Sequence, residues 1–147
     1  MIKNKLSLLG FKAGLPEKEI QNQITACLDA YGVFWWRQNN GMAVYQDKNR
    51  GERKVRYGTA GASDIGALHK GRFIAIEIKR VKEHEYIKKH YNRILSGNIK
   101  SKKDAHISNQ IMFIEKVIDR GGIGFFASDV SHVINELESI DILDKKN

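Results

Sequence analysis

The segment from Ser63 to Lys79 constrains the fold most strongly, because it holds two short apolar runs on either side of Lys70-Gly71. In the second run, three isoleucines occupy every other position from 74 to 78, and Glu77 and Lys79 take the alternate positions. Successive side chains of a strand point to opposite faces of its sheet. We therefore expect the isoleucines to face a hydrophobic core and Glu77 and Lys79 to project together from the opposite face.

The position of Lys70-Gly71 predicts a two-residue hairpin turn between strands at Ile65–Leu68 and Phe73–Ile78. This turn would place Asp64 directly opposite Glu77, with the two side chains roughly 5 Å apart on one face. A loop with an odd number of residues would break this register. The segment therefore predicts a pair of facing carboxylates.

Two facing carboxylates repel each other unless a cation lies between them. A hard divalent cation with oxygen ligands meets this need, and Mg²⁺ is the usual ion where phosphates are handled. Lys79 could hold a water molecule or neutralise charge that develops on a phosphate. The alternative is an ordinary cross-strand ion pair among Asp64, Glu77 and Lys79, because an acid followed at a loose distance by Glu-x-Lys occurs often by chance.

Two helices frame this segment in the sequence. Pro16 is well placed to open the first, and its apolar residues recur at helical spacing up to Gly32. Ser108 can cap the second, which places Gln110 in its first turn. From spacing alone, Glu19 is a first-turn acid that complements the helix dipole, and Gln110 is a surface residue.

The remaining patterns predict further strands and helices. Val33–Trp36 is expected to be a buried strand, and Met42–Tyr45 is expected to return from it after a turn at Asn39-Asn40-Gly41. Ile123–Ala127 is a short apolar strand, and Asp129 can cap a last helix. Helices and strands in this order predict one α/β domain over residues 1–147, with a mixed central β-sheet flanked by helices.

The chain is strongly basic, with 25 Lys+Arg against 17 Asp+Glu and a net charge of +8. This surplus suggests a polyanionic partner, most simply a nucleic acid. One cluster lies within 47–57, which is expected to be a polar loop, and another lies on a helix expected at Glu83–Leu95 and its flanks. Either cluster could instead be a solvated face. The candidate nucleic-acid contacts are Lys48, Arg50, Arg53, Lys54, Arg56, Lys82, Lys88, Lys89 and Arg93.

Other features narrow the class of protein. No run approaches the ~20 apolar residues that a membrane span needs, so we expect no membrane partner. The single cysteine, Cys27, cannot form an intrachain disulfide, which fits a reducing cytoplasm. The five histidines do not have a recognisable zinc-binding spacing. The sequence thus predicts a basic cytoplasmic domain.

These motifs, taken in order, resemble the PD-(D/E)xK nuclease superfamily, and most closely its VRR-NUC (virus-type replication-repair nuclease) branch. The resemblance runs from about Pro16 to Ala127. The matching features are the acid in Glu19-Ile20-Gln21, the turn Asn39-Asn40-Gly41, Gly61-Ala62-Ser63-Asp64, Ile76-Glu77-Ile78-Lys79, Gln110 at the start of a helix and the strand that ends at Ala127. The fold that it implies is a restriction-endonuclease-like mixed sheet flanked by helices.

The resemblance also implies roles for individual residues. Asp64, Glu77 and the backbone carbonyl of Ile78 would bind Mg²⁺ or Mn²⁺, and Glu19 would complete the acidic cluster, with Glu17 as the alternative. Lys79 would position the attacking water, and Gln110 would support the site. The reaction implied is hydrolysis of DNA phosphodiester bonds to leave a 5′-phosphate and a 3′-hydroxyl. Stand-alone members of this size resemble phage or bacterial homodimers that act on branched DNA such as four-way (Holliday) junctions in DNA repair.

The segment from Val81 to Ile107 departs from the compact members of the family, because it replaces a short link with a basic helical insertion. This departure puts in question the DNA geometry and the dimer arrangement more than the metal chemistry. Two alternatives to a DNA nuclease remain open. One is a non-catalytic DNA-binding module on the same fold, and the other is an RNA-processing nuclease.

Overall fold

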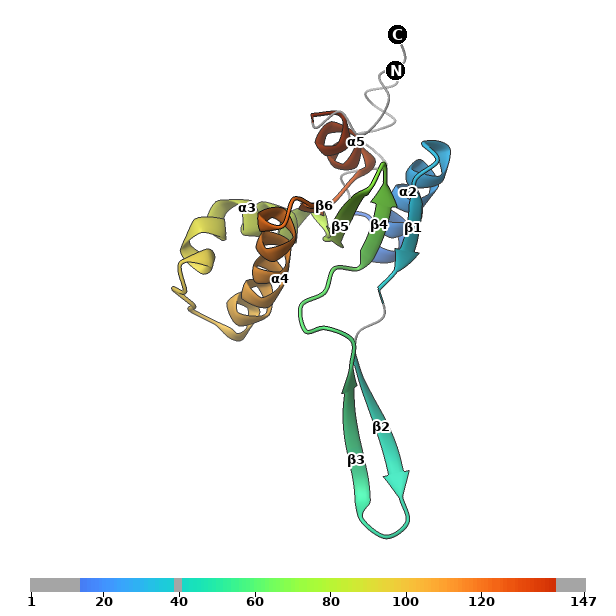
Figure 1. The fold of residues 1–147 in the computed structure, drawn as a ribbon. Helices are drawn as coiled ribbons and strands as arrows, with labels where there is room; N and C mark the ends of the chain where they lie inside the picture. The colour runs from blue at the N-terminus through green and yellow to red at the C-terminus, as the bar shows by residue number, and fades with distance from the viewer. Residues whose placement is uncertain (1–13, 39–40, 140–147) are drawn as a thin grey trace.

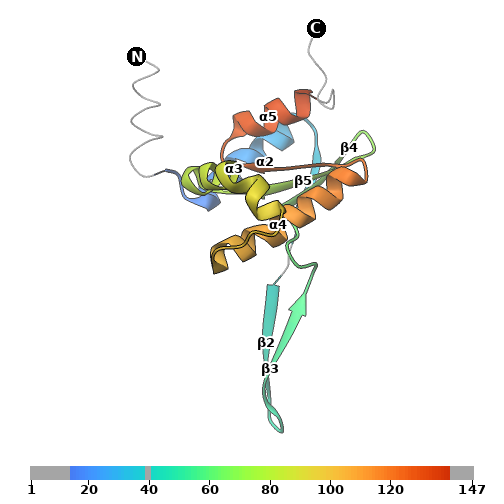
Figure 2. The same ribbon diagram turned by 90° about the vertical axis from the view of Figure 1, so that its left-hand side faces the viewer.

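The computed structural model describes residues 14–38 and 41–139, which form a four-stranded sheet with helices on both faces (Figures 1 and 2). The strand order is β1 (Phe34–Arg37), β4 (Ile65–His69), β5 (Arg72–Ile78) and β6 (Ile123–Ala127). β4 is antiparallel to both of its neighbours, β1 and β5, whereas β5 and β6 are parallel. The predicted α/β fold with a mixed sheet is therefore confirmed.

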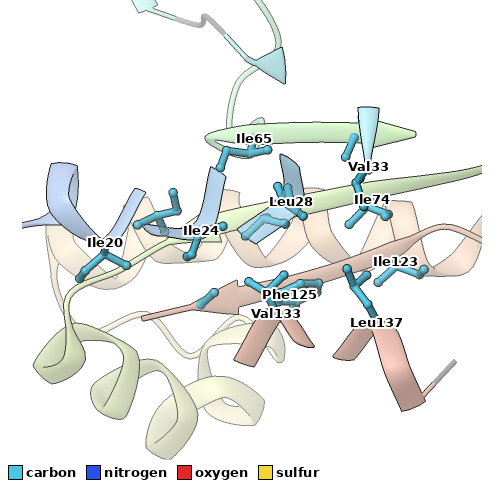
Figure 3. Close-up of a cluster of buried hydrophobic side chains, with 14 residues drawn as sticks. Ile20, Ile24, Leu28, Val33, Ile65, Ile74, Ile123, Phe125, Val133 and Leu137 are labelled. Atoms are coloured by element: carbon cyan, nitrogen blue, oxygen red, sulfur yellow. The ribbon is translucent and has the colours of Figure 1, made fainter. Parts of the chain in front are cut away.

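One face of the sheet packs against α2 (Glu17–Ala30) and α5 (Val130–Ser139). The three alternating isoleucines of β5 lie on this face and are completely buried, as predicted. Figure 3 shows the core that they join, in which Ile24 and Leu28 of α2 meet Val133 and Leu137 of α5. Pro16 precedes the first helix, and Asp129 caps the last by accepting a hydrogen bond of 3.0 Å from the main-chain N–H of His132, as expected.

The opposite face is covered by α3 (Val81–Leu95) and α4 (Lys102–Asp119). Ile87 and Ile94 of α3 pack with Ile111 and Ile114 of α4 and with Ala75 of β5. The helix expected at Glu83–Leu95 is therefore present. It forms part of the hydrophobic core of the domain.

The predicted hairpin register is confirmed by the pairing of β4 with β5. His69 lies opposite Arg72, and Ile65 lies opposite Ile76, as a two-residue turn requires. Lys70 and Gly71 both have positive φ, of 50° and 78°, which is the backbone geometry of this type of tight turn.

Three expectations about the other elements are wrong. The strand at Phe34 is not buried, because β1 lies at the edge of the sheet and Phe34 is 69% exposed. The expected return strand does not pair with β1, and the expected loop 47–57 is largely a strand. Instead β2 (Gly41–Asp47) pairs only with β3 (Gly51–Tyr57) in a separate hairpin, which extends away from the domain (Figure 1). Residues 39 and 40 of the expected turn lie outside the described residues.

The start of α4 also differs from the prediction. The helix begins at Lys102, because Ser101 caps it by accepting a hydrogen bond of 3.1 Å from the main-chain N–H of Asp104. Ser108 and Gln110 therefore lie inside the helix and not at its start. None of the helices among the described residues is long and apolar enough to span a membrane.

Candidate functional site

The candidate site lies at the C-terminal end of β5, on the face covered by α3 and α4. Glu77 and Lys79 are 4% and 7% exposed, and Gln110 of α4 is 6% exposed. Alternation along β5 places Glu77 on this face because Ala75, two residues earlier, packs against α3 and α4. Burial of three such polar side chains is costly unless each has partners, so their contacts decide what the site can do.

Gln110 holds Glu77 through a short hydrogen bond. Its Nε2 atom donates to Oε1 of Glu77 at 2.7 Å. The two remaining polar atoms, Oε2 of Glu77 and Oε1 of Gln110, are buried and have no hydrogen-bond partner. Both are oxygen acceptors, and an unpartnered buried oxygen is costly. The geometry therefore leaves two buried oxygen atoms that could act as ligands of a cation or accept a hydrogen bond.

Asp64, the residue immediately before β4, is the second carboxylate of the site. Its Oδ2 atom accepts a hydrogen bond of 2.8 Å from the main-chain N–H of Ile78, between Glu77 and Lys79. This contact holds Asp64 beside the end of β5, as the hairpin register predicts. Burial and then the negative charge of Asp64 raise the pKa of Glu77 to about 9, against the opposing effect of Lys79.

The third acid of the site is better represented by Glu17 than by Glu19. Partial burial and the charge of Asp64 raise the pKa of Glu17, and the charge of Lys79 acts on it in the opposite direction. Glu17 is therefore electrostatically linked to Asp64 and Lys79, although Glu17 and Glu19 are both exposed on α2. Among the described residues, no group of three acids, histidines or cysteines lies close enough together to hold a metal ion.

This donor set still fits Mg²⁺, because the ion keeps several water ligands and is often held by only one or two carboxylates. Asp64 and Glu77 would supply those carboxylates. Oε2 of Glu77 has no hydrogen-bond donor and lies beside Asp64, so either a cation or a proton shared with Asp64 would satisfy it. Mn²⁺ is compatible with the same oxygen ligands.

The segment that leads into Asp64 is fixed by contacts that the sequence did not predict. The main-chain N–H of Gln38 donates to the carbonyl oxygen of Asp64 at 2.9 Å, and its Nε2 donates to Oγ of Ser63 at 2.8 Å. Ser63 is buried, and its hydroxyl donates to the carbonyl oxygen of Ile65 at 2.9 Å. Gly61, with φ of 75°, lies so close to α4 that a Cβ atom would be 2.4 Å from the carbonyl oxygen of Asn109.

A pair of histidines, His84 of α3 and His132 of α5, meets at the end of β6. The main-chain N–H of Lys79 donates to the carbonyl oxygen of Ala127, and the next residue, Ser128, contacts both histidines. Its Oγ lies 2.8 Å from Nδ1 of His84, and its main-chain N–H donates to Nδ1 of His132 at 3.2 Å. Burial, followed by Lys88 and His132, lowers the pKa of His84 to about 4. These contacts join α3, β6 and α5, and no sequence spacing indicated them.

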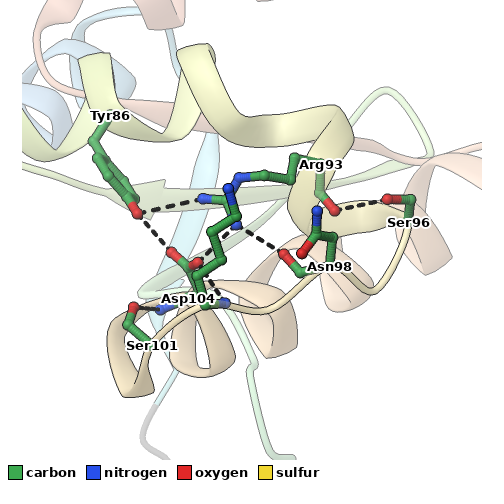
Figure 4. Close-up of polar contacts among 7 residues, drawn as sticks. Tyr86, Arg93, Ser96, Asn98, Ser101 and Asp104 are labelled. Carbon is green, nitrogen blue, oxygen red and sulfur yellow. Dashed lines mark hydrogen bonds and ion pairs between the residues drawn. The ribbon is translucent and has the colours of Figure 1, made fainter.

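Most of the candidate nucleic-acid contacts are exposed, but Arg93 forms contacts within the fold. Its Nη1 atom lies 2.8 Å from Oδ2 of the buried Asp104, with which it forms an ion pair (Figure 4). It also donates to the carbonyl oxygen of Asn98. These contacts leave the guanidinium of Arg93 less available to a phosphate than the exposed cations are. The exposed candidates are Lys48, Arg50, Arg53 and Lys54 on the β2–β3 hairpin and Lys82, Lys88 and Lys89 on α3. The side chain of Arg56, in β3, lies outside the described part of the structure.

A cavity of about 590 Å³ opens between the loop at Thr59 and the second half of α4. Its lining is mainly apolar and includes Phe73, Phe113 and Val117, with Lys116 and Arg120 as cations. Neither Asp64 nor Glu77 lines it. The cavity is thus separate from the carboxylates, although both lie on the α3–α4 side of the sheet.

No protein-family model matches the chain, and no curated protein is significantly similar to it in sequence, so the family resemblance stays a prediction from the motifs.

Proposed function

We propose that the protein is a metal-dependent deoxyribonuclease that hydrolyses phosphodiester bonds. The observation that carries the proposal is the arrangement around Glu77. This buried carboxylate has one oxygen bound to Gln110 and the other without a partner, and Asp64 lies beside it. Two neighbouring carboxylates, of which Glu77 is buried and Asp64 is half-buried, repel each other when both are ionised, and a bound divalent cation would offset this repulsion.

Each side chain has a chemical task in this proposal. Asp64 and Glu77, with the carbonyl of Ile78, would hold Mg²⁺ or Mn²⁺. The ion would supply positive charge to the phosphate as negative charge develops on it. Lys79 would orient the attacking water or donate to a phosphate oxygen, and Gln110 would keep Glu77 in the orientation that binds the cation.

The substrate is proposed to be branched DNA, such as a four-way junction, and the active form a homodimer. Both rest on the family resemblance alone. The exposed basic residues of the β2–β3 hairpin and of α3 support a nucleic-acid substrate in general, because phosphate contacts supply most of the affinity of such proteins.

A cleavage assay tests the proposal. Purified protein would be incubated with duplex, flap and four-way-junction DNA, and with an RNA duplex, in EDTA, Mg²⁺ or Mn²⁺. We expect DNA cleavage that requires the metal and is lost in Asp64→Asn and Lys79→Ala. The matched controls are Asp119→Asn and Lys18→Ala, which change exposed residues of α4 and α2. Cleavage that persists in Asp64→Asn would overturn the site, and cleavage of RNA alone would change the substrate.

A non-catalytic DNA-binding module is the second candidate. One observation favours it, namely that no three metal-binding side chains of the described residues converge. It predicts salt-sensitive DNA binding without cleavage in either metal. In that case Asp64→Asn would bind DNA at least as tightly as the unchanged protein, because it removes a negative charge.

A further inference from the structure

The hairpin formed by β2 and β3, which we call the arm, pairs with no other strand of the described residues. Its strands pair only with each other, over seven residues in each strand. At about 3.3 Å per residue, the arm is roughly 23 Å long. Figures 1 and 2 show it extending away from the sheet and its helices. Every side chain of the arm with a described exposure is exposed, including Val44 at 51% and Tyr45 at 57%.

Such a ribbon is marginally stable alone in water, because two strands without a covered face bury little apolar surface. A partner that orders the arm must contact what the arm offers, and its sequence offers positive charge. Between residues 41 and 57 there are five Lys+Arg and two acidic residues. Lys48 and Arg50 lie at the tip, where the two strands connect.

The cations also occur on both faces of the ribbon. Tyr45 pairs with Arg53, and Val44 pairs with Lys54, so the adjacent residues Arg53 and Lys54 point to opposite faces. A flat protein surface would cover one face and would favour an apolar one. A nucleic-acid groove instead has phosphates along both edges, so cations on two faces and at the tip match it. This charge pattern favours nucleic acid over a second copy of the chain.

The dimensions of the ribbon favour duplex DNA. The major groove of B-DNA is about 12 Å wide and about 8.5 Å deep, and it admits a two-stranded β-ribbon. The corresponding groove of A-form RNA is too deep and narrow for side chains to read.

The base of the arm is joined to the candidate site. Gln38 precedes the arm in the chain, and it donates one hydrogen bond to the carbonyl oxygen of Asp64 and another to Ser63. The segment after the arm leads directly to Ser63 and Asp64. A duplex held by the arm would therefore be positioned with respect to Asp64 and Glu77.

We propose that the arm enters the major groove of a DNA duplex that flanks the phosphodiester bond to be cleaved. This inference deepens the proposed nuclease function and rests on it, because it assumes that the bound DNA is cleaved. The binding of the arm to a duplex can be measured without any cleavage.

The experiment compares two double variants of the full chain in EDTA, where no metal-dependent cleavage occurs. Lys48→Ala/Arg50→Ala removes two charges from the tip of the arm. Lys100→Ala/Lys102→Ala removes two exposed charges at the start of α4 and is the matched control. Affinity for a 30-base-pair duplex would be measured against salt concentration, and major-groove contacts would be mapped by methylation protection at guanine N7.

We expect the tip variant to reduce the slope of log K against log[salt] by up to about 2, because each lost phosphate contact removes about 0.9. Guanine N7 protection should weaken in the tip variant and persist in the control. Unchanged slope and protection would overturn the proposal. A shift of the tip variant from dimer to monomer with unchanged DNA binding would also overturn it and assign the arm to an interface between copies.

The outcomes for the arm and for the nuclease are distinguishable. Guanine protection that depends on the tip, without cleavage in Mg²⁺ or Mn²⁺, would support the arm and contradict the nuclease. Metal-dependent cleavage without such protection would support the nuclease and contradict the proposal for the arm. Because the tip residues are exposed, the variants are expected to keep the fold, which thermal melting would verify.

Discussion

The main-chain N–H of Ile78 donates a hydrogen bond of 2.8 Å to Oδ2 of Asp64, which ties the residue before β4 to the end of β5. The bond leaves the carboxylate of Asp64 beside that of Glu77, which is buried and holds one oxygen without a partner. The consequence is a pair of adjacent carboxyl groups whose simultaneous ionisation is unfavourable unless a cation lies between them.

The first prediction concerns Glu77→Gln in the absence of metal. Burial and Asp64 raise the pKa of Glu77 from an ordinary value of 4.5 to about 9, so folding favours its protonated form. The stability contributed by the bound proton is fully present below about pH 4.5 and is lost as the pH rises towards 9. Glutamine does not titrate. We therefore expect Glu77→Gln to have a higher Tm than the unchanged protein at pH 8 in EDTA, and nearly the same Tm at pH 4.

Thermal melts at both pH values would check this, with Glu19→Gln as the exposed control. Added Mg²⁺ should raise the Tm of the unchanged protein at pH 8 and not that of Glu77→Gln, because ligands that bind only the folded state stabilise it. A Tm of Glu77→Gln below that of the unchanged protein at pH 8 would contradict the prediction.

The second prediction concerns Gln110, which touches Glu77 and not the substrate. Gln110→Ala removes the hydrogen bond of 2.7 Å that orients the carboxylate. Loss of such a partner of a metal ligand typically costs 10- to 100-fold in metal affinity. We expect the concentration of Mn²⁺ needed for half-maximal cleavage to rise by about that factor. Gln23→Ala, at an exposed position of α2, is the control, and an equal effect in both variants would contradict the role of Gln110.

The third prediction separates Glu17 from Glu19. Both residues are exposed on α2, but the charges of Asp64 and Lys79 act on Glu17. Glu17→Gln should therefore weaken metal-dependent cleavage by about tenfold or more, as expected for a group that supports metal ligands. Glu19→Gln should leave the rate unchanged. Titration of both variants with Mn²⁺ would measure the difference, and the reverse ranking would restore Glu19 to the site.

The local pattern of the sequence predicted the β4–β5 register because the residue count of the turn determines it. Asp64 and Glu77 followed from that register. The start of α4 is also readable in principle, since Ser101 and Asp104 have the spacing of a capping motif, although Ser108 is an equally plausible cap from the sequence alone. The sequence indicates a strand at Met42–Tyr45 but not β3 or its pairing with β2, because neither face of the arm is covered and β3 has no apolar alternation. The Gln38–Ser63 contact depends on distant segments that only the tertiary structure brings together.

The fourth prediction concerns pH and His84. Burial, Lys88 and His132 lower the pKa of His84 to about 4, against an ordinary value of 6.5. The unfolded chain therefore binds a proton more readily than the folded protein does, and the stability contributed by neutral His84 is lost as the pH falls from about 6.5 to about 4. His84→Gln should flatten the pH dependence of the free energy of unfolding in this interval. His106→Gln, at an exposed position of α4, should leave it unchanged, and urea melts at several pH values would compare them.

The fifth prediction concerns the loop that delivers Asp64 to the site. Gly61 and Gly97 both have positive φ, of 75° and 91°, so alanine is strained at either position. They differ in the space around them. A Cβ atom at Gly61 would lie 2.4 Å from the carbonyl oxygen of Asn109, whereas nothing lies within 4 Å of one at Gly97. Gly97→Ala should cost about 1 kcal/mol from backbone strain alone. Gly61→Ala should cost a further ~1–3 kcal/mol, because the loop must move away from α4.

That displacement also has a functional consequence, because Gly61 is three residues before Asp64. If the contact with α4 sets the position of the carboxylate, Gly61→Ala should lower metal-dependent cleavage even at temperatures where the variant is fully folded. Gly97→Ala should lose stability without losing cleavage. Urea melts and cleavage rates on the same samples would separate the two effects. Equal stability of the two variants would contradict the close approach of Gly61 to Asn109 on which the argument depends.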